Sequence, residues 1–228
     1  MFVDERQELI KQMLQEKQRV SVKDLSIYFN CSEDLIRKDL ATIEKSGLCK
    51  RVYGGAILNR KDLHKNLVQD RIFENKTAKE LIARKAYALL ENGDTIYLDV
   101  STTNIILASM INNGNKEITI VTSMFDIIKN IKNWQYKVIF IGGEVVESGD
   151  SCNGIITTEQ IRRYNFDKAF FGTVGINIKA DSVQTYNVND GLTKHLAMKQ
   201  SKQNYLLFEK EKLALAGNYN YAKLSEFD

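Results

Sequence analysis

The feature that most constrains this chain is a regular alternation, along its C-terminal part, of short strand-like runs and helix-like stretches. The runs are rich in β-branched and aromatic residues: TIYL, ITIVT, KVIFI, KAFF and YLLF. A helical crossover between two strands brings them into one sheet in parallel, with helices on its faces. We therefore predict an α/β domain with a doubly wound, mostly parallel sheet over residues 71–228.

The residues before the first run support this boundary. Residues 59–70, NRKDLHKNLVQD, have weak periodicity and mixed charge, so we expect a linker there. Thr77 with Glu80 then resembles the cap of a long helix. That helix would carry apolar residues at Leu81, Ile82, Ala86, Leu89 and Leu90. The prediction is an N-terminal domain over 1–58, a linker and a C-terminal domain.

Residues 1–58 show helical spacing instead of strand-like runs. Each expected helix follows a residue whose side-chain oxygen can accept the free N–H groups of a first turn. The expected caps are Asp4, with Gln7 in a capping box, Ser21 and Ser32. The apolar stripes after these caps are Leu9, Ile10, Met13 and Leu14, then Val22, Leu25 and Phe29, and finally Ile36, Leu40 and Ile43. The first helix would span roughly 5–16, and all three pack into one unit.

The junction between the second and third helices indicates the type of unit. Asn30 and Cys31 make a turn short enough to force a steep crossing, which is the helix-turn-helix arrangement. Gly47 would end the third helix in a left-handed conformation. The residues after it, LCKRVYGGAIL, predict a hairpin around Gly54 and Gly55. Such a hairpin would be a wing beside the helix-turn-helix.

Cations on the third helix and the hairpin suit a DNA partner. Arg37 and Lys38 lie opposite the apolar stripe of a helix that could enter the major groove. A bidentate contact of arginine with guanine contributes about 1–3 kcal/mol of discrimination. Lys50, Arg51 and Tyr53 on the hairpin could reach phosphate or the minor groove, which positions a protein without reading sequence. A protein-interaction module remains an alternative for such a unit.

The charge is unevenly distributed along the chain. Residues 1–61 hold 12 of the 32 Lys and Arg residues and 9 of the 29 Asp and Glu residues, which accounts for the whole formal net charge of +3. The excess is concentrated between residues 37 and 61, where Arg37, Lys38, Lys45, Lys50, Arg51, Arg60 and Lys61 face only Asp39 and Glu44. A local positive patch is typical of a polyanion partner, although a solvated basic face would look the same.

Residues 4–58 resemble the DNA-binding domain of the DeoR family of bacterial regulators. The resemblance rests on the RVSVKDL segment, the serine before the third helix, the IRKDL core of that helix and the closing RVYGGA. It implies that Ser32, Arg37 and Lys38 face DNA and that Arg51, Tyr53, Gly54 and Gly55 form the wing. The full predicted DNA-binding set is Ser21, Ser32, Asp34, Leu35, Arg37, Lys38, Lys50, Arg51, Tyr53, Gly54 and Gly55. Leu35 stands where the family usually has threonine, and Tyr53 where histidine is frequent, so the preferred operator could differ.

Ligands of a doubly wound sheet bind at the carboxyl ends of its strands, and the turns there are rich in Gly, Ser and Thr. The run TIYL leads into Asp99, Ser101, Thr102 and Thr103 and then a helix, whose N-terminus suits a phosphate. Other strands end in Gly142–Gly143, in Gly172 and Gly175, and in Glu209–Lys212. A single loop of this kind is more often an ordinary turn, but several at one sheet edge favour an anion pocket.

Residues 71–228 resemble the sensor domain of the same family, whose fold is related to ribose-5-phosphate isomerase. The resemblance implies a phosphorylated sugar or polyol effector, with its phosphate at Lys76, Thr102 and Thr103 and its hydroxyls at Asp99 or Glu209. The full predicted set is Arg71, Lys76, Asp99, Ser101, Thr102, Thr103, Gly142, Gly143, Gly172, Gly175, Lys194, Glu209 and Lys212.

This half departs from the family pattern at several points. Ser101 replaces the usual glycine, and Glu209 replaces a common aspartate. The chain also ends before the final strand and helix of many members, which leaves open whether the pocket is weakened.

These patterns together predict a transcriptional regulator, expected to be a repressor of sugar or polyol genes that acts as a homo-oligomer on double-stranded DNA. The alternative is a sugar-phosphate isomerase-like enzyme with an accessory helical module, disfavoured because no convincing acid–base pair is found beyond Asp99 and Glu209.

The scattered Cys31, Cys49 and Cys152 suggest neither disulfide nor metal site, and we expect no cofactor. Without an apolar span or signal core, the expected location is cytoplasmic, with no membrane contact. Operator sequence, effector identity, the direction of its effect, and dimer or tetramer stay open.

Overall fold

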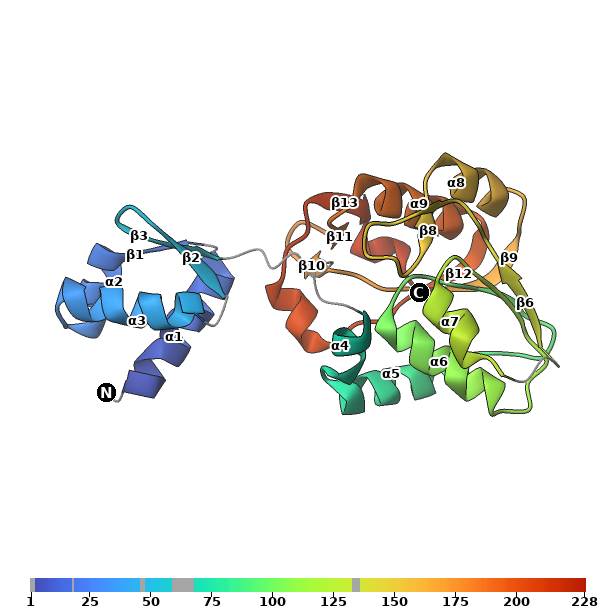
Figure 1. Cartoon of the computed structure of the whole chain (residues 1–228), viewed down its shortest axis with the longest axis horizontal. Helices are drawn as coiled ribbons and strands as arrows, with labels where there is room; N and C mark the ends of the chain where they lie inside the picture. The colour runs from blue at the N-terminus through green and yellow to red at the C-terminus, as the bar shows by residue number, and fades with distance from the viewer. Residues whose placement is uncertain (1–2, 18, 46–47, 59–67, 133–135) are drawn as a thin grey trace. The chain divides into compact units, whose positions relative to one another are not determined.

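The computed structural model describes residues 3–17, 19–45, 48–58, 68–132 and 136–228 (Figure 1). The chain divides into two compact units, Met1–Asp62 and Leu63–Asp228. No described helix is long and apolar enough to cross a lipid bilayer.

The first unit, called the head below, packs helices against a small sheet. Its elements are α1 (Val3–Lys17), β1 (Arg19–Ser21), α2 (Val22–Phe29), α3 (Glu33–Lys45), β2 (Cys49–Val52) and β3 (Gly55–Leu58). The predicted stripes of α1 and α3 meet in its core, where Ile10, Leu14, Ile36, Leu40 and Ile43 are almost fully buried. The helical spacing read from the sequence therefore identified the faces that pack.

The caps of α2 and α3 are confirmed. Ser21 Oγ accepts the Asp24 N–H at 3.0 Å, and Ser32 Oγ accepts the Leu35 N–H at 3.3 Å. Asn30 adopts the left-handed conformation at the end of α2, with φ 49°. The expected cap at Asp4 is wrong, because α1 begins one residue earlier and takes it into the first turn. Gly47 lies outside the described residues.

The wing differs in detail from its prediction. Within the described residues the head sheet has the order β1-β3-β2, and β1 was not predicted from the sequence. The turn is formed by Tyr53 and Gly54, while Gly55 opens β3 and pairs with Ser21. A Cβ on Gly55 would lie 2.1 Å from the backbone oxygen of Val20, so β1 and β3 can lie this close only if residue 55 is a glycine.

The second unit, called the sensor below, alternates strands and helices as predicted. Four of the runs form β4 (Thr95–Leu98), β5 (Thr119–Thr122), β6 (Lys137–Phe140) and β9 (Phe166–Phe171). The fifth run, YLLF, overlaps only the end of β12 (Ser201–Leu206), which begins four residues before it. Among the described residues these strands make one parallel sheet in the order β12-β9-β4-β5-β6. The order reverses between β4 and β9, so the crevice at their carboxyl ends is the topological switch point.

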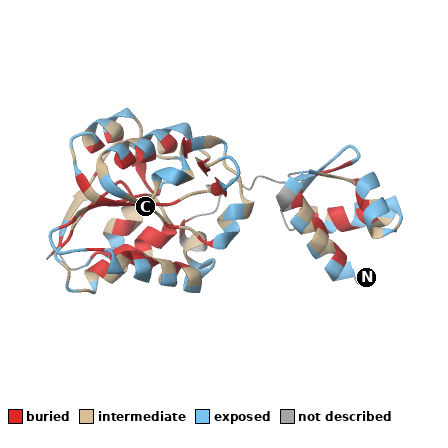
Figure 2. Cartoon of the chain, turned by 180° about the vertical axis from the view of Figure 1, so that it is seen from behind, coloured by how far each residue is buried: buried red, intermediate tan, exposed pale blue. Residues whose placement is uncertain are grey.

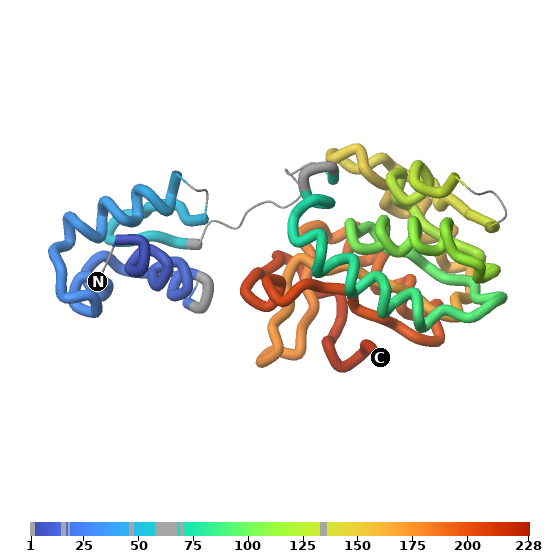
Figure 3. Tube along the Cα trace, turned by 90° about the horizontal axis from the view of Figure 1, so that it is seen from below, coloured from blue at the N-terminus to red at the C-terminus, as the bar shows by residue number. Residues whose placement is uncertain are grey.

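Helices cover both faces of this sheet (Figures 1 and 3). One core contains residues of α5 (Lys76–Ala88), α6 (Thr102–Asn112) and α7 (Phe125–Asn130), and α5 packs alongside α6. The other contains residues of α8 (Ile155–Ile161) and α9 (Val188–Lys199). Burial concentrates on the strands and inner helix faces (Figure 2). The predicted doubly wound class is confirmed.

Smaller elements surround the main sheet. They are α4 (Val68–Phe73), β7 (Glu144–Val145), β8 (Cys152–Asn153), β10 (Gly175–Asn177), β11 (Ser182–Thr185), η2 (Lys210–Ala214), β13 (Tyr219–Ala222) and η3 (Leu224–Glu226). In the described part of the chain, β10-β11-β13 and β7-β8 form separate antiparallel sheets.

Two expectations near the start of the sensor are wrong. The chain is already helical at Val68, inside the predicted linker, of which residues 59–67 lie outside the described ranges. Helix α5 begins at Lys76 after a left-handed Asn75, so Thr77 falls in its first turn and does not cap it.

Candidate functional site

The exposed face of α3 carries a cluster of alternating charge. Arg37 donates to Glu33 Oε2 at 2.6 Å and to Asp34 Oδ1 at 2.7 Å, so its guanidinium pairs with two acids on its own helix. Lys38 is exposed beside this cluster, and Leu35 is half-buried. The side chains predicted to reach DNA are therefore presented to solvent, but Arg37 is already ion-paired.

A buried ion pair fixes α3 on the body of the head. Arg6 Nε donates to Asp39 Oδ2 at 2.6 Å, and Gln7 Nε2 donates to Asp39 Oδ1 at 2.9 Å. Asp39 was counted among the acids facing the basic segment, yet it is buried against α1. The helical phase of Asp39, adjacent to the apolar stripe at Ile36, Leu40 and Ile43, could have indicated this.

The wing is anchored to the end of α3. Arg51 donates its backbone N–H to Glu44 Oε1 at 2.8 Å and its Nε to Glu44 Oε2 at 2.7 Å. Both hydrogen bonds lower the pKa of the Glu44 carboxyl, and the bond from the Arg51 backbone has the larger effect. Lys50 is exposed, and Tyr53 at the tip is fully exposed. Arg51 thus positions the wing.

Four of the predicted DNA contacts line one hollow of about 670 Å³ formed by residues of α1, α2 and the wing. They are Ser21, Tyr53, Gly54 and Gly55. Lys17 and Arg19 also line it, which gives this hollow basic groups at its wall.

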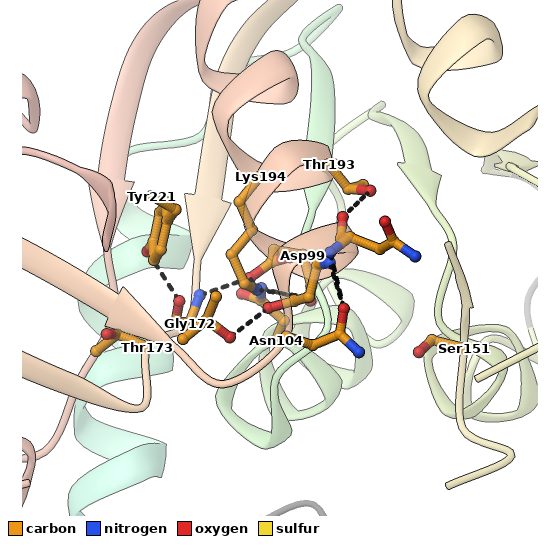
Figure 4. A network of polar contacts seen from close by, with 12 residues as sticks. Asp99, Asn104, Ser151, Gly172, Thr173, Thr193, Lys194 and Tyr221 are labelled. Atoms are coloured by element: carbon orange, nitrogen blue, oxygen red, sulfur yellow. Dashed lines mark hydrogen bonds and ion pairs between the residues drawn. The ribbon is translucent and has the colours of Figure 1, made fainter. Parts of the chain in front are cut away.

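At the switch point of the sensor, Asp99 joins a buried polar network (Figure 4). Its Oδ2 accepts the Gly172 N–H at 2.9 Å and a hydrogen bond from Lys194 Nζ. Tyr221 Oη donates to the Gly172 carbonyl at 3.0 Å, which ties the same loop to β13. The network links the ends of β4 and β9 to helix α9.

Lys194 is shared between two carboxylates. Its Nζ lies 3.4 Å from Asp190 Oδ1, and Thr185 Oγ1 donates to Asp190 Oδ2 at 2.6 Å. Burial opposes its charge, but Asp190 and Asp99 outweigh that effect and raise the pKa of Lys194. Burial raises the pKa of Asp99, against the opposing pull of Lys194. With Asp99 only 1% exposed, this carboxylate is committed to internal partners.

Helix α6 begins beside Asp99 and Gly172. Ser101 caps α6, because its Oγ accepts the Asn104 N–H at 3.1 Å. The N–H groups of Thr102 and Thr103 also belong to the first turn, so they have no intrahelical partner. Asn104 Nδ2 donates to the carbonyls of Asp99 and of Phe170, at 2.9 and 2.8 Å. The first turn of α6 therefore presents backbone donors from a rigid support.

A second polar cluster lies at the same edge of the sheet. Lys79 is buried, donates to the Arg71 carbonyl and lies 3.4 Å from Glu209. Arg71 Nη2 lies 3.3 Å from Asp150 Oδ2. Burial lowers the pKa of Lys212, assisted by the charges of Lys79 and Arg71 and opposed by Glu209. We call Arg71, Lys79, Glu209 and Lys212, with Asp150, the cation cluster.

The structure brings together only part of the predicted effector set. Asp99, Ser101, Thr102, Thr103, Gly172 and Lys194 gather at the switch point, and Arg71, Glu209 and Lys212 in the cation cluster. Lys76 is instead 61% exposed on its side chain and lies 3.8 Å from Glu80. Lys79 was missed, although it shares helical spacing with the buried Ala83 and Ala86, which is a signal for a lysine that faces inward.

Three predicted glycines remain. The carbonyl of Gly142 accepts hydrogen bonds from Thr157 Oγ1 and Gln160 Nε2 of α8, while Gly143 and Gly175 are closely packed. A Cβ on Gly143 would lie 2.0 Å from Thr157 Oγ1, and one on Gly175 would lie 2.1 Å from the Leu215 carbonyl. Close packing therefore requires glycine at both positions. Among the described residues, no group of three or more His, Cys, Asp or Glu is placed to hold a metal ion.

Comparisons with known proteins match both units. Residues 6–62 match the DeoR-like helix-turn-helix domain, and residues 74–228 match the DeoR C-terminal sensor domain. The chain is 29% identical to the HTH-type transcriptional regulator GolR of Listeria innocua, over 100% of this chain and 89% of that protein. It is 33% identical to the HTH-type transcriptional regulator FruR of Bacillus subtilis, over 93% and 84%.

A further relative is the lactose phosphotransferase system repressor of Staphylococcus aureus, which is 27% identical over 97% of this chain and 88% of that one. Among solved structures, ribose 5-phosphate isomerase A of Methanocaldococcus jannaschii is 13% identical over 61% of this chain and 55% of that chain, with a TM-score of 0.45. The two relatives that align over nearly the whole chain are named transcriptional regulators, so the enzyme alternative is rejected. The chain belongs to the DeoR family of DNA-binding transcriptional regulators.

Proposed function

We propose that this regulator represses genes of sugar or polyol metabolism and that a phosphorylated sugar, bound at the carboxyl edge of the sensor sheet, controls its binding to operator DNA. One relative is named a repressor of a lactose phosphotransferase system. The observation that carries the DNA half is the exposed face of α3, capped by Ser32 and held on its support by the buried pair of Arg6 and Asp39.

The DNA contacts divide by role. Arg37 and Lys38 on α3 would enter the major groove and read bases, while Lys50 and Tyr53 on the wing would contact the backbone. Arg51 supports the wing from Glu44 and so would act indirectly.

The effector phosphate is assigned to the first turn of α6 and the cation cluster. Helix N–H groups of Thr102 and Thr103 favour an anion by hydrogen bonding and by the helix dipole. In the cation cluster, Lys212 has a burial-lowered pKa, and the buried Nε of Arg71 has no partner among the described residues. A phosphate would supply the negative charge and acceptor that these groups lack.

Lys79 replaces Lys76 in this assignment. Lys79 is buried in the cluster with Glu209, whereas Lys76 is on the solvent side of the same helix. Asp99 is reassigned as well, because its carboxylate already accepts from Lys194 and Gly172. It would position the switch-point loop and leave sugar hydroxyls to other groups.

The active species is proposed to be a two-fold homo-oligomer. A single winged helix contacts few base pairs, and paired half-sites about one helical turn or a multiple of it apart match a two-fold dimer. A coupling of roughly 1–3 kcal/mol between effector and DNA would change affinity about 5- to 150-fold.

Selection of bound duplexes from a randomised library tests the DNA half. The expected product is a sequence with two related half-sites in inverted orientation. Recovery of no preferred sequence at any salt concentration would contradict the proposal.

Calorimetry with a panel of hexose and pentose phosphates, and with inorganic phosphate, tests the effector half. We expect binding by the native protein, at least tenfold weaker binding by Lys79→Gln, and unchanged binding by Lys85→Gln, an exposed lysine on the same helix. Lack of binding across the panel, or equal losses in both variants, would refute the assignment.

A further inference from the structure

The base-reading face of α3 has no net charge. Its first two turns expose Glu33, Asp34, Arg37 and Lys38, two acids against two bases. A protein surface that binds a polyanion usually gains affinity from excess positive charge, because each lysine or arginine that neutralises a phosphate releases counterions from the DNA. Here that gain is cancelled at the point of base contact, which requires a reason.

Stability does not supply this reason. The two ion pairs of Arg37 join residues three and four apart on one helix, and the side chains of Arg37, Glu33 and Asp34 are 54%, 46% and 83% exposed. Exposed pairs of this kind contribute little to folding. The acids also suit the positive end of the α3 dipole, but an acid in the first turn does so wherever it points.

The geometry instead limits what Arg37 can bind. Its guanidinium uses one N–H of Nη1 for Asp34 and one of Nη2 for Glu33, so a phosphate that approaches Arg37 must either displace these carboxylates or bind beside their negative charge, and both cost free energy. Phosphates present one kind of acceptor on every duplex, so this cost falls on all sequences alike. A guanine edge in the correct operator position offers two acceptors in the plane of the guanidinium and can repay the exchange.

We infer that Glu33 and Asp34 are specificity-determining residues that act through Arg37, holding it away from the phosphates of non-operator DNA. The inference rests on the proposed function, in which α3 reads the major groove. Affinity for DNA backbone then comes from other cations, such as Lys50 on the wing, while the α3 face contributes discrimination.

The test uses the full chain and two duplexes of equal length and composition: one recovered by selection, the other scrambled. Glu33→Gln and Asp34→Asn remove each charge without changing shape. We expect each variant to bind the scrambled duplex about three- to tenfold more tightly, because Arg37 is released to contact a phosphate. The slope of log affinity against log salt concentration should become steeper by up to about one unit, which corresponds to one more phosphate contact. The ratio of operator to scrambled affinity should fall correspondingly.

A matched control is Glu8→Gln. Glu8 pairs with Lys11 three residues later on the exposed side of α1, so this substitution also removes one exposed acid from a helical pair of the head. The operator ratio of Glu8→Gln should equal that of the native protein. Thermal unfolding of all variants shows whether the head stays folded.

The route through Arg37 is tested by repeating both substitutions in an Arg37→Ala background. There, loss of the carboxylates should leave the salt dependence on scrambled DNA unchanged. An equal gain with and without Arg37 would show direct repulsion of phosphate and overturn the inference, as would an unchanged ratio in the single variants. If the native protein itself showed no preference between the duplexes, the proposed function would fail instead.

Discussion

The buried pair beneath α3 carries the sharpest stability prediction. Arg6 and Asp39 have side chains only 8% and 3% exposed, and the Nε–Oδ2 distance is 2.6 Å. Asp39→Ala leaves the guanidinium buried without its acceptor, a change that costs about 3–5 kcal/mol in other proteins. We expect about 3 kcal/mol, since in so small a domain water can approach the guanidinium on modest rearrangement. That is roughly a hundredfold in the opening equilibrium of the head.

Hydrogen exchange resolved by segment is the appropriate assay, because the two units can unfold separately and a single transition would mix them. Backbone amides of α1 and α3 should lose about a hundredfold in protection in Asp39→Ala, while those of the sensor sheet keep theirs. Asp34→Ala on the exposed face of the same helix is the control and should change protection by no more than about threefold. Arg6→Met with Asp39→Leu should recover much of the loss, because an apolar pair avoids desolvating charges. Equal protection in Asp39→Ala and Asp34→Ala would refute the reasoning.

Three further predictions concern the wing and the switch point. Gly55→Ala should destabilise the wing by about 2 kcal/mol or more and raise exchange of the β3 amides, because its Cβ would meet a backbone oxygen of β1; an unaltered exchange pattern would contradict this. The pKa of the Glu44 carboxyl, measured by carbon-detected NMR, should lie below that of an ordinary glutamate, and Arg51→Ala should abolish this shift. Because the pKa is lowered in the folded state, the carboxylate stabilises the fold above the unfolded pKa, and this stabilisation is lost as the pH falls through the folded pKa. Lys194→Met should cost about 3–5 kcal/mol in urea unfolding of the sensor, because it strands two carboxylates; a loss under 1 kcal/mol would argue against the buried network.

The sequence identified much of the fold because its local signals agreed with one another. Ser21 and Ser32 precede apolar stripes at helical spacing, and both cap helices in the structure. Four of the strand-like runs became strands of one sheet, and the fifth overlaps the end of β12, since β-branched composition and regular alternation with helices point to the same topology.

What the sequence could not show depends on contacts between distant residues. Lys194 reaches Asp99 across 95 positions, and no local pattern reveals that this carboxylate is already occupied. Strand β1 has three residues and exists because β3 pairs with it, not through its own propensity. Asn75 caps α5 through a left-handed backbone with no side-chain hydrogen bond, so the capping rule selected Thr77 instead.

The assignment of α3 as the reader of DNA is tested most directly by comparing Arg37→Ala with Lys50→Ala on a selected and a scrambled duplex over a range of salt concentrations. Arg37→Ala should lose about 5- to 150-fold on the selected duplex and at most about threefold on the scrambled one. Lys50→Ala should weaken both alike and reduce the salt slope by about one. Equal losses of Arg37→Ala on the two duplexes would contradict the account.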